Sequence, residues 1–283
     1  MKNKLLYISV LAILFIIALY FLWSWREALL VMVKVGTAGQ TEGTEQSDLS
    51  CNIAVVPIVG EIIPYAGADK DGSGNELPPT TNADDVLSLL RAAESNPNMR
   101  GVLVRIDSNG GTPVASEIIS NALKRTPLPV VALIREMGTS GAYLAATGAR
   151  TIIASPFSNI GSIGVTMSYL ENTRRNAQEG LQYVPLASAQ FKDYGNPDKS
   201  LTYAERMLIE RDLTIYHKQF VEEVAKNRNL PLEQVAKLAD GSAMPGALAL
   251  ENGLVDALGD QQTARVWFAD NLTISSTNVV FCE

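Results

Sequence analysis

The sequence has few of the residues on which several common kinds of binding depend. It contains no run of lysine or arginine, and its 30 acidic residues outnumber its 23 basic residues, which gives a formal net charge of −7. Binding to the phosphates of nucleic acids depends on clustered cations, so we expect no nucleic-acid partner. The acidic excess is typical of a solvated surface.

Histidine is almost absent. The chain has 1 histidine, His217, which lies inside a segment with a helical pattern. A Ser/His/Asp triad needs histidine as its general base, and a lone histidine in a helix is more often an ordinary, half-exposed residue. The sequence therefore argues against such a triad, and a nucleophilic serine would need a base of another type.

Cysteine is also scarce, with 2 residues in the chain. Cys51 precedes the first strand-like run, IAVVPIVG, and Cys282 closes the last one, NVVF. If these two strands are neighbours, the cysteines can form a disulfide, but two cysteines so far apart in sequence can equally be free thiols. The sequence leaves both alternatives open.

A calcium-binding loop is suggested and then excluded by residues 69–80, DKDGSGNELPPT. The segment has aspartate at its first and third positions, as in an EF-hand loop, but its twelfth position is Thr80 rather than a bidentate glutamate. The prolines before Thr80 cannot continue as the exit helix. We therefore expect a surface loop, and we predict no metal site and no cofactor.

One long apolar run stands out at the start of the chain. Residues 5–25 carry no charge, which is enough for a helix that spans a bilayer. The run ends in bulky residues, including Trp23 and Trp25, rather than in a small-residue cleavage site, so we expect an uncleaved transmembrane anchor. Two lysines within residues 1–4 predict a cytoplasmic N-terminus and a body outside the cytoplasm.

The rest of the chain divides into a tether and a body. Residues 36–50 are polar and lack hydrophobic periodicity, which predicts a flexible tether. In the body, residues 51–283, strand-like and helix-like segments alternate at first, and this predicts an α/β fold with mostly parallel strands. The pattern then becomes mainly helical, beginning at a capping box of Thr202 and Glu205.

Ser140 is a candidate nucleophile. It lies in a stretch of small residues, GTSGAYLAATGA, directly after the apolar run PVVALI, so it is expected at a strand-to-helix junction. A lysine can serve as base when burial lowers its pKa from about 10.4 towards ~7–8. Lys192 lies in a loop that contains glycine and proline and leads into the capped helix. A loop lysine is more often a solvated charge, so these features alone do not identify the base.

Four segments, taken in order, resemble the signal peptide peptidase A family of membrane-anchored serine proteases with a Ser/Lys dyad. They are VLVRIDSNGG, MGTSGAYLAATGARTIIASPFSNIGSIGV, FKDYGNPDKSLTYAER and GSAMPGALALENGLVDALGD. The match covers roughly residues 53–260 and includes the spacing between Ser140 and Lys192. The resemblance implies that Ser140 is the nucleophile and Lys192 the general base. It also implies a Clp protease/crotonase-like scaffold of repeated β-β-α units with a helical C-terminal part, preceded by one transmembrane helix.

The resemblance implies roles for four further residues. Ser162 would orient the amino group of the lysine, and Gly110, Gly111 and Gly141 would form an oxyanion hole. Glycine suits such a place because it has no Cβ to block close approach.

The chain departs from the family pattern at two positions. Asn109 stands where similar proteins usually have proline, and Ala142 stands where they usually have a second glycine. Asparagine can adopt turn geometry and alanine is the smallest replacement, so we expect catalysis to be retained, and the sequence leaves the shape of the oxyanion loop open.

The implied function is that of a membrane-anchored serine endopeptidase. It would cleave apolar peptides, such as remnant signal peptides, at the cell membrane, and it would assemble as a homo-oligomer. Two alternatives are a regulatory protease of a stomatin-like membrane partner and an inactive, crotonase-like binding scaffold. The presence of both Ser140 and Lys192 favours an active protease.

Overall fold

The computed structural model describes residues 51–67 and 71–282, which belong to the unit Ser50–Glu283. The predicted cytoplasmic N-terminus, the anchor over residues 5–25 and the tether over residues 36–50 all lie outside the described residues and stay predictions. Within the described part, no helix is both long enough and apolar enough to cross a membrane.

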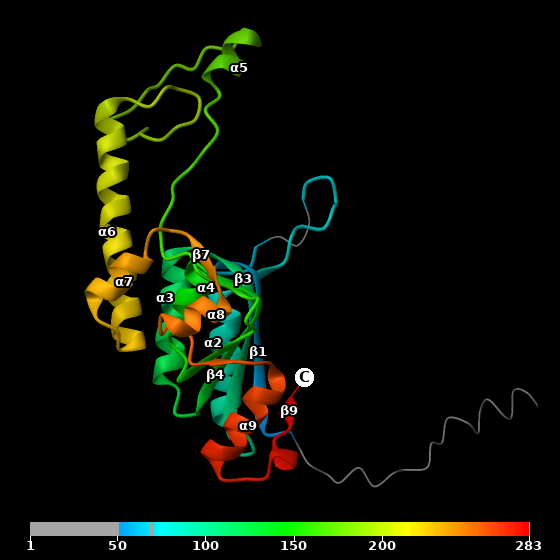
Figure 1. Cartoon of the computed structure of the whole chain (residues 1–283). Helices are drawn as coiled ribbons and strands as arrows, with labels where there is room; N and C mark the ends of the chain where they lie inside the picture. Colours follow the sequence, from blue (N-terminus) through cyan, green and yellow to red (C-terminus); the bar gives the residue numbers. More distant parts are fainter. Residues whose placement is uncertain (1–50, 68–70, 283) are drawn as a thin grey trace, which may run out of the picture. The chain divides into compact units, whose positions relative to one another are not determined.

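A parallel sheet forms the centre of this unit (Figure 1). Its strands follow the order β2-β1-β3-β4-β5-β8, and each adjacent pair in that order is parallel. The bounds are β1 (Ile53–Ile63), β2 (Thr80–Asn82), β3 (Gly101–Gly111), β4 (Val130–Thr139), β5 (Thr151–Ala154) and β8 (Ala257–Leu258). Strands covered on both faces are apolar at successive positions, as at Val102, Leu103 and Val104. The predicted α/β fold is confirmed.

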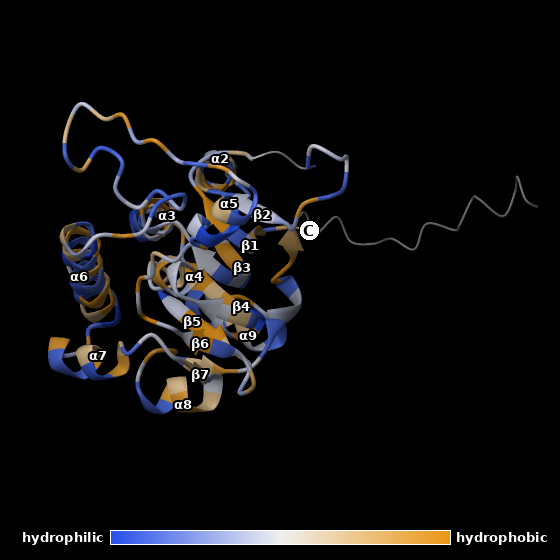
Figure 2. Cartoon of the chain, turned by 90° about the horizontal axis from the view of Figure 1, so that it is seen from above, coloured by the Kyte–Doolittle hydropathy of each residue, from blue (hydrophilic) through white to orange (hydrophobic). Residues whose placement is uncertain are grey.

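Helices cover both faces of the sheet (Figure 2). On one face, α2 (Ala83–Ser95), α3 (Pro113–Arg125) and α4 (Gly141–Ala146) bury the larger of two hydrophobic clusters. On the other face, α9 (Gln261–Leu272) packs Phe268 against Leu103 and Val131. The two clusters explain why neighbouring positions of one strand are both buried.

The strands β3 and β4 are long and change partners part of the way along. The register between them shifts after Ile106, and β4 pairs first with β5 and then, from Met137, with β6 (Asn159–Gly161). The long strands β1, β3 and β4 all have an irregular register, and α2, α3 and α4 follow them in turn, with the short strand β2 between β1 and α2. The predicted scaffold of repeated β-β-α units stays a prediction.

The C-terminal part is mainly helical, as predicted, with short strands between the helices. Its elements are α5 (Thr173–Gln178), α6 (Tyr203–Arg228), α7 (Leu232–Leu238), β7 (Ala243–Pro245), α8 (Gly246–Glu251), β8, α9, η1 (Ser276–Asn278) and β9 (Phe281–Cys282). The predicted capping box at the start of α6 is present, because Thr202 and Glu205 each bind the other's backbone N–H. Figure 1 shows that the segment between β6 and α6, which includes α5, extends beyond the edge of the sheet.

A disulfide joins the two ends of the described body. Cys51 and Cys282 are bonded, with their Cα atoms 5.1 Å apart. They come together because β9 pairs in parallel with the first residues of β1, with Cys282 opposite Ala54. The structure thus decides between the two alternatives that the sequence left open, and a disulfide is typical of a protein that folds in an oxidising compartment.

We expect the disulfide to stabilise the body considerably, since it crosslinks positions 231 residues apart. Replacing both Cys51 and Cys282 by serine should lower the free energy of unfolding by about 2–5 kcal/mol, because the unfolded chain loses a long-range constraint. Urea unfolding of the full chain in detergent, with and without a reducing agent, measures the effect. Reduced wild type should match the double variant, and equal stability of all samples would contradict the prediction.

Candidate active site

Ser140 occupies a strained turn between β4 and α4. Its backbone has φ 52° and ψ −127°, a region that residues other than glycine rarely adopt. Two hydrogen bonds fix the turn: the Ser140 N–H donates to the Gly161 carbonyl over 2.7 Å, and the Leu144 N–H donates to the Ser140 carbonyl over 3.1 Å. Ser140 therefore lies at the predicted strand-to-helix junction, half-buried and held by the backbone on both sides.

The small residues after Ser140 allow α4 to pack closely on α3. A Cβ on Gly141 would lie 2.2 Å from Ser116 Oγ, and one on Gly148 would lie 2.2 Å from the Ser120 carbonyl oxygen. Ala142 is fully buried. Larger side chains at these positions would push α4 away from α3 and move the turn that carries Ser140.

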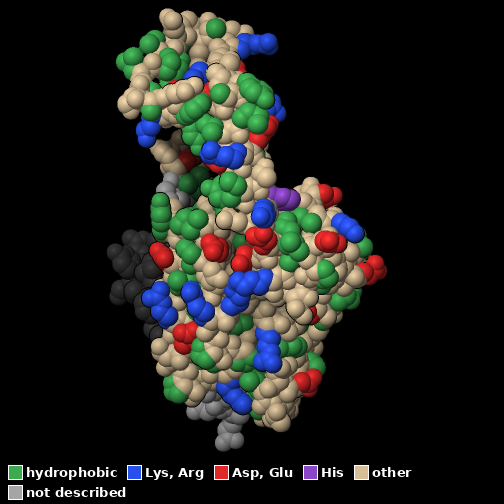
Figure 3. Space-filling view, turned by 90° about the vertical axis from the view of Figure 1, so that its left-hand side faces the viewer, with side chains coloured by type: hydrophobic (Ala, Val, Ile, Leu, Met, Phe, Trp, Pro, Cys, Tyr) green, Lys and Arg blue, Asp and Glu red, His purple; other side chains and the backbone are tan. Residues whose placement is uncertain are grey.

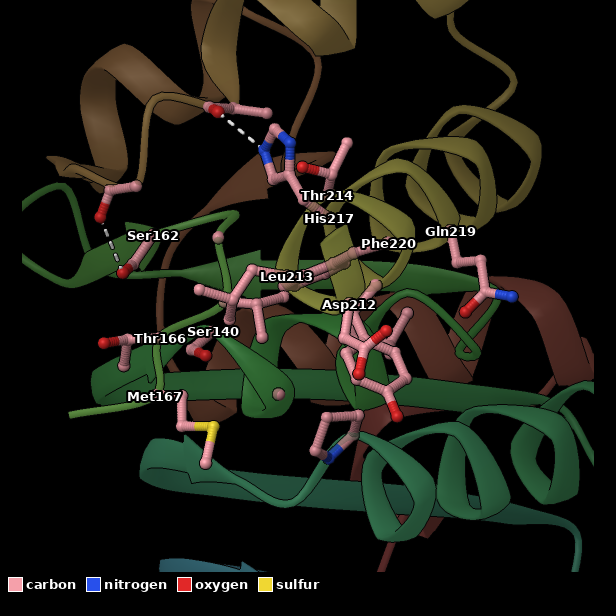
Figure 4. A pocket seen from close by; sticks show the side chains of 18 of the residues that line it. Ser140, Ser162, Thr166, Met167, Asp212, Leu213, Thr214, His217, Gln219 and Phe220 are labelled. Carbon is pink, nitrogen blue, oxygen red and sulfur yellow. Dashed lines mark hydrogen bonds between the residues drawn. The ribbon is translucent and has the colours of Figure 1, made fainter. Parts of the chain in front are cut away.

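Ser140 faces a cleft of about 1150 Å³. The cleft lies between the starts of α3 and α4, the segment after β6, the middle of α6 and the loop 239–241 (Figure 4). Much of its wall is apolar, with contributions from Val114, Leu144, Val165, Met167, Leu213 and Phe220. Of the described residues that line it, none is lysine or arginine. An extended peptide with apolar side chains matches such a wall better than a polyanion does.

The three glycines of the predicted oxyanion hole meet beside Ser140. A Cβ on Gly110, whose φ is 108°, would lie 2.9 Å from Ser140 Cβ, and a Cβ on Gly111 would lie 2.0 Å from the Ile62 carbonyl oxygen. A Cβ added to Gly141 would lie 3.2 Å from the Gly111 amide nitrogen, so the backbones of these two glycines are close together. Gly111 and Gly141 both line the cleft.

The structure also brings Ser162 into the cleft. Ser162 follows β6, and its N–H donates to the Ser242 carbonyl over 3.0 Å. Its hydroxyl donates to the Gly241 carbonyl over 2.9 Å (Figure 4). A hydroxyl that already donates keeps its lone pairs for accepting, so Ser162 can receive a hydrogen bond from an amino group in the cleft.

Lys192 lies elsewhere. It belongs to the segment between α5 and α6, where its N–H donates to the Ala189 carbonyl over 3.1 Å, and it is not among the residues that line the cleft. Its ammonium group makes no hydrogen bond or ion pair with the rest of the described chain. Tyr194, two residues further on, does reach the wall of the cleft. Within one chain, the structure therefore does not bring the predicted base to Ser140.

Polar side chains hold the segment around Lys192 in shape. Asp193 accepts hydrogen bonds from the Tyr183 hydroxyl over 2.9 Å and from Asn196 over 3.0 Å. Asp198 accepts from Asn176 over 3.0 Å, and bonds to asparagine side chains lower the pKa of this carboxyl. These bonds tie the two limbs of the segment together and give it a defined shape outside the cleft.

A buried ion pair connects this segment to α6. The carboxylate of Glu205, which is 3% exposed, accepts from the Lys199 ammonium and from the N–H and hydroxyl of Thr202. The bond from Lys199, followed by that from the Thr202 backbone, lowers the pKa of Glu205 to about 2. Glu205 thus anchors the end of the segment that carries Lys192.

His217 lines the same cleft as Ser140 but does not contact it. Its Nε2 is 2.9 Å from the Ala239 carbonyl oxygen, and Leu213 lies between His217 and Ser140 in the view of Figure 4. The sequence context of His217 predicts an ordinary helix residue and does not indicate its position in the cleft. The four-residue spacing of Ile209, Leu213 and His217 was the available signal, because such residues share one face of a helix.

Comparison with known proteins identifies the family. The sequence profile of peptidase family S49 matches residues 122–275. A putative protease of Synechocystis sp. is 36% identical over 65% of this chain and 67% of its own length. A putative signal peptide peptidase SppA of Enterococcus faecium is 30% identical over 65% of this chain and 54% of its own length. The chain belongs to peptidase family S49, which confirms the resemblance found in the sequence.

Two further comparisons concern length and fold. A putative protease of Methanocaldococcus jannaschii is 29% identical over 69% of this chain, and the match covers 63% of that protein. The chain thus spans about half to two thirds of these three curated relatives. Among solved structures, a ClpP1 mutant of Listeria monocytogenes aligns with 73% of this chain and 91% of its own, with TM-score 0.47 and 15% identity. The Clp protease/crotonase-like assignment stays a prediction.

The Glu205 ion pair predicts a specific pH dependence of stability. Because folding lowers the pKa of Glu205 from its ordinary value of 4.5 to about 2, this carboxylate stabilises the fold above pH 4.5 and loses its effect as the pH falls towards 2. Glu205→Gln should therefore be less stable than wild type at pH 7. As the pH falls from 4.5 to 2, the variant should lose less of its free energy of unfolding than wild type does. Urea unfolding of the full chain over this pH range is the measurement.

Glu210→Gln is the matched control for this test. Glu210 forms an exposed ion pair with Arg206, and we expect its replacement to change stability little at any pH. A stability difference between wild type and Glu205→Gln that stays constant from pH 7 to pH 2 would show that the charge of Glu205 is not the cause.

Proposed function

We propose that the chain is a serine endopeptidase with Ser140 as its nucleophile. The observation that carries the proposal is the position of Ser140: a strained turn presents it to a large cleft, with the backbone of Gly111 and Gly141 beside it. Membership of peptidase family S49 supports the same reaction. In this proposal, Ser140 Oγ attacks the carbonyl carbon of a peptide bond and forms an acyl-enzyme, which water then hydrolyses.

The backbone amides of Gly111 and Gly141 are the proposed oxyanion donors. Both residues line the cleft next to Ser140, and their backbones approach each other closely. The Gly110 N–H donates to Ser108 Oγ over 3.1 Å and is therefore already engaged. Two N–H groups fixed beside the attacked carbonyl would stabilise the negative charge that develops on its oxygen.

We propose that Lys192 of a neighbouring copy supplies the base. Lys192 is outside the cleft of its own chain, no lysine or arginine lines that cleft among the described residues, and Ser162 offers an acceptor for an amino group. Lys192 would take the proton of Ser140 Oγ and later give it to the leaving amine. Burial between two copies would favour the neutral amine that this role needs.

Exposed apolar side chains support the proposed homo-oligomer. They gather on the segment between β6 and α6 and on the start of α6, which form the upper part of the molecule in Figure 3. Leu170, Leu186 and Tyr203 are 87%, 94% and 78% exposed. A surface of this kind is typical of an interface, and covering it with a second copy would place the Lys192 segment against a neighbour.

The proposed location is the cell membrane, with the catalytic body outside the cytoplasm. The charges of residues 1–4 and the apolar run 5–25 support this topology, and the disulfide between Cys51 and Cys282 agrees with an oxidising compartment. The apolar wall of the cleft matches apolar peptides, so remnant signal peptides are the proposed substrates.

The two roles can be tested by mixing inactive variants. Ser140→Ala and Lys192→Ala should each lower kcat on signal-peptide-like substrates by at least about a thousandfold. If the base comes from a neighbour, a 1:1 mixture that exchanges subunits should recover activity at up to about a quarter of the sites, because that share pairs an intact serine with an intact lysine. Lys237→Ala, which removes an exposed lysine of α7, is the control and should keep full activity.

Each other outcome has a clear meaning. Turnover by a well-folded Lys192→Ala variant would reject Lys192 as base. A mixture that exchanges subunits but stays inactive would place the base within the same chain. Wild type that binds such peptides and cleaves none of them would favour the inactive binding scaffold.

The proposed topology gives a separate prediction. Protease added to intact spheroplasts should cut the tether at residues 36–50 and release a soluble body, since this polar segment lacks the apolar residues needed to fold. Immunoblotting of the supernatant measures the release. Cleavage that occurs only after lysis would place the body in the cytoplasm.

A further inference from the structure

Next to the cleft, β1 contains an irregular position that turns a carbonyl group towards β3. The register between β1 and β3 shifts between Val59 and Glu61. Gly60, at the shift, has φ 71°, and a Cβ there would lie 1.8 Å from the Pro79 carbonyl oxygen. Only glycine fits this place without a movement of the backbone, so the Gly60 carbonyl is held in a fixed direction.

Ser108 on β3 binds this carbonyl and, at the same time, an amide of the glycine pair. Ser108 is 2% exposed. Its hydroxyl donates to the Gly60 carbonyl over 2.5 Å and accepts from the Gly110 N–H over 3.1 Å. A single hydroxyl thus uses its hydrogen and a lone pair to link β1 to the backbone that leads into the cleft.

These two bonds set the direction of the next amide. The Gly110 N–H is directed at Ser108, and the φ of Gly110 is 108°. The next peptide group therefore turns towards Ser140, and its nitrogen, that of Gly111, lies close to Gly141. Two successive glycines have little backbone preference of their own, so an outside contact must select this conformation. Ser108 provides one such contact from a buried position, in addition to the pairing of the two glycines with Glu61 and Ile62 of β1.

We propose that Ser108 is a positioning residue, which holds the Gly110–Gly111 backbone so that the Gly111 N–H faces the reacting carbonyl. This inference rests on the proposed peptidase function. Ser108 does not line the cleft, so it would act only through Gly110 and Gly111. Without its hydroxyl, the Gly60 carbonyl and the Gly110 N–H would each lose a buried partner, and the pairing of the two glycines with Glu61 and Ile62 of β1 would have to hold their backbone alone.

The test compares Ser108→Ala with Ser108→Thr in the full chain. A displaced oxyanion donor weakens binding of the transition state more than binding of the substrate. Ser108→Ala should therefore lower kcat on a signal-peptide-like substrate by about 10- to 100-fold and leave KM within about twofold. The affinity for a peptide boronic acid, which forms a tetrahedral adduct with a serine nucleophile, should fall by a similar factor. Ser108→Thr restores the hydroxyl and should recover most of both losses.

Ser120→Ala is the matched control. Ser120 is also 2% exposed, and its hydroxyl accepts a hydrogen bond from Asn227, on α6 and outside the cleft. We expect kcat, KM and boronic acid affinity to stay at their wild-type values in this variant. Loss of activity in Ser120→Ala as large as in Ser108→Ala would mean that any buried hydroxyl has this effect, and would overturn the inference.

Hydrogen exchange gives a readout that does not need activity. Ser108→Ala should speed exchange in the peptide that contains Gly110 and Gly111, as measured by mass spectrometry, while Ser120→Ala should leave that peptide unchanged. If wild type cleaves no peptide, the proposed function fails, and faster exchange still supports Ser108 as the residue that fixes this backbone. Unchanged exchange and unchanged kcat in Ser108→Ala would overturn the inference, as would a loss confined to KM.

Discussion

The geometry of the candidate active site depends on backbone approaching backbone more closely than any side chain permits. The ends of β3 and β1 and the start of α4 meet at Gly110, Gly111 and Gly141, where a Cβ would lie within 3 Å of a neighbouring atom. This closeness brings two backbone amides next to Ser140 and holds its turn in a region of positive φ. The parallel sheet supplies the rigid support, since backbone strain persists only where the surrounding structure fixes it.

The same constraint explains why the site is built in layers. Ser140 is held by backbone hydrogen bonds to β6 and within α4, and the glycine pair is held by Ser108, which is in turn bonded to the irregular position in β1. Ser108 and Gly60 do not line the cleft, so both act on it only through the glycine pair. Changes in the sheet can therefore alter the proposed oxyanion hole without touching a substrate.

A second part of the molecule is organised differently. The segment between β6 and α6 is shaped by polar bonds of Asp193 and Asp198 and anchored by the Glu205 ion pair, and it exposes apolar side chains instead of burying them. A segment with its own internal bonds and an uncovered apolar surface is suited to meeting another copy. The position of Lys192 on it, outside the cleft of its own chain, is the basis for the proposed shared site.

The sequence by itself determined the features that depend on local pattern: the α/β alternation, the capping box of Thr202 and Glu205, the strand-to-helix junction at Ser140 and, through ordered motifs, the family. Only the tertiary structure decided that Cys51 pairs with Cys282, that His217 faces the cleft and that Lys192 does not. The reason is physical. Capping and hydrophobic periodicity act over a few residues, whereas the pairing of β9 with β1 and the path of a long loop depend on contacts between residues far apart in sequence.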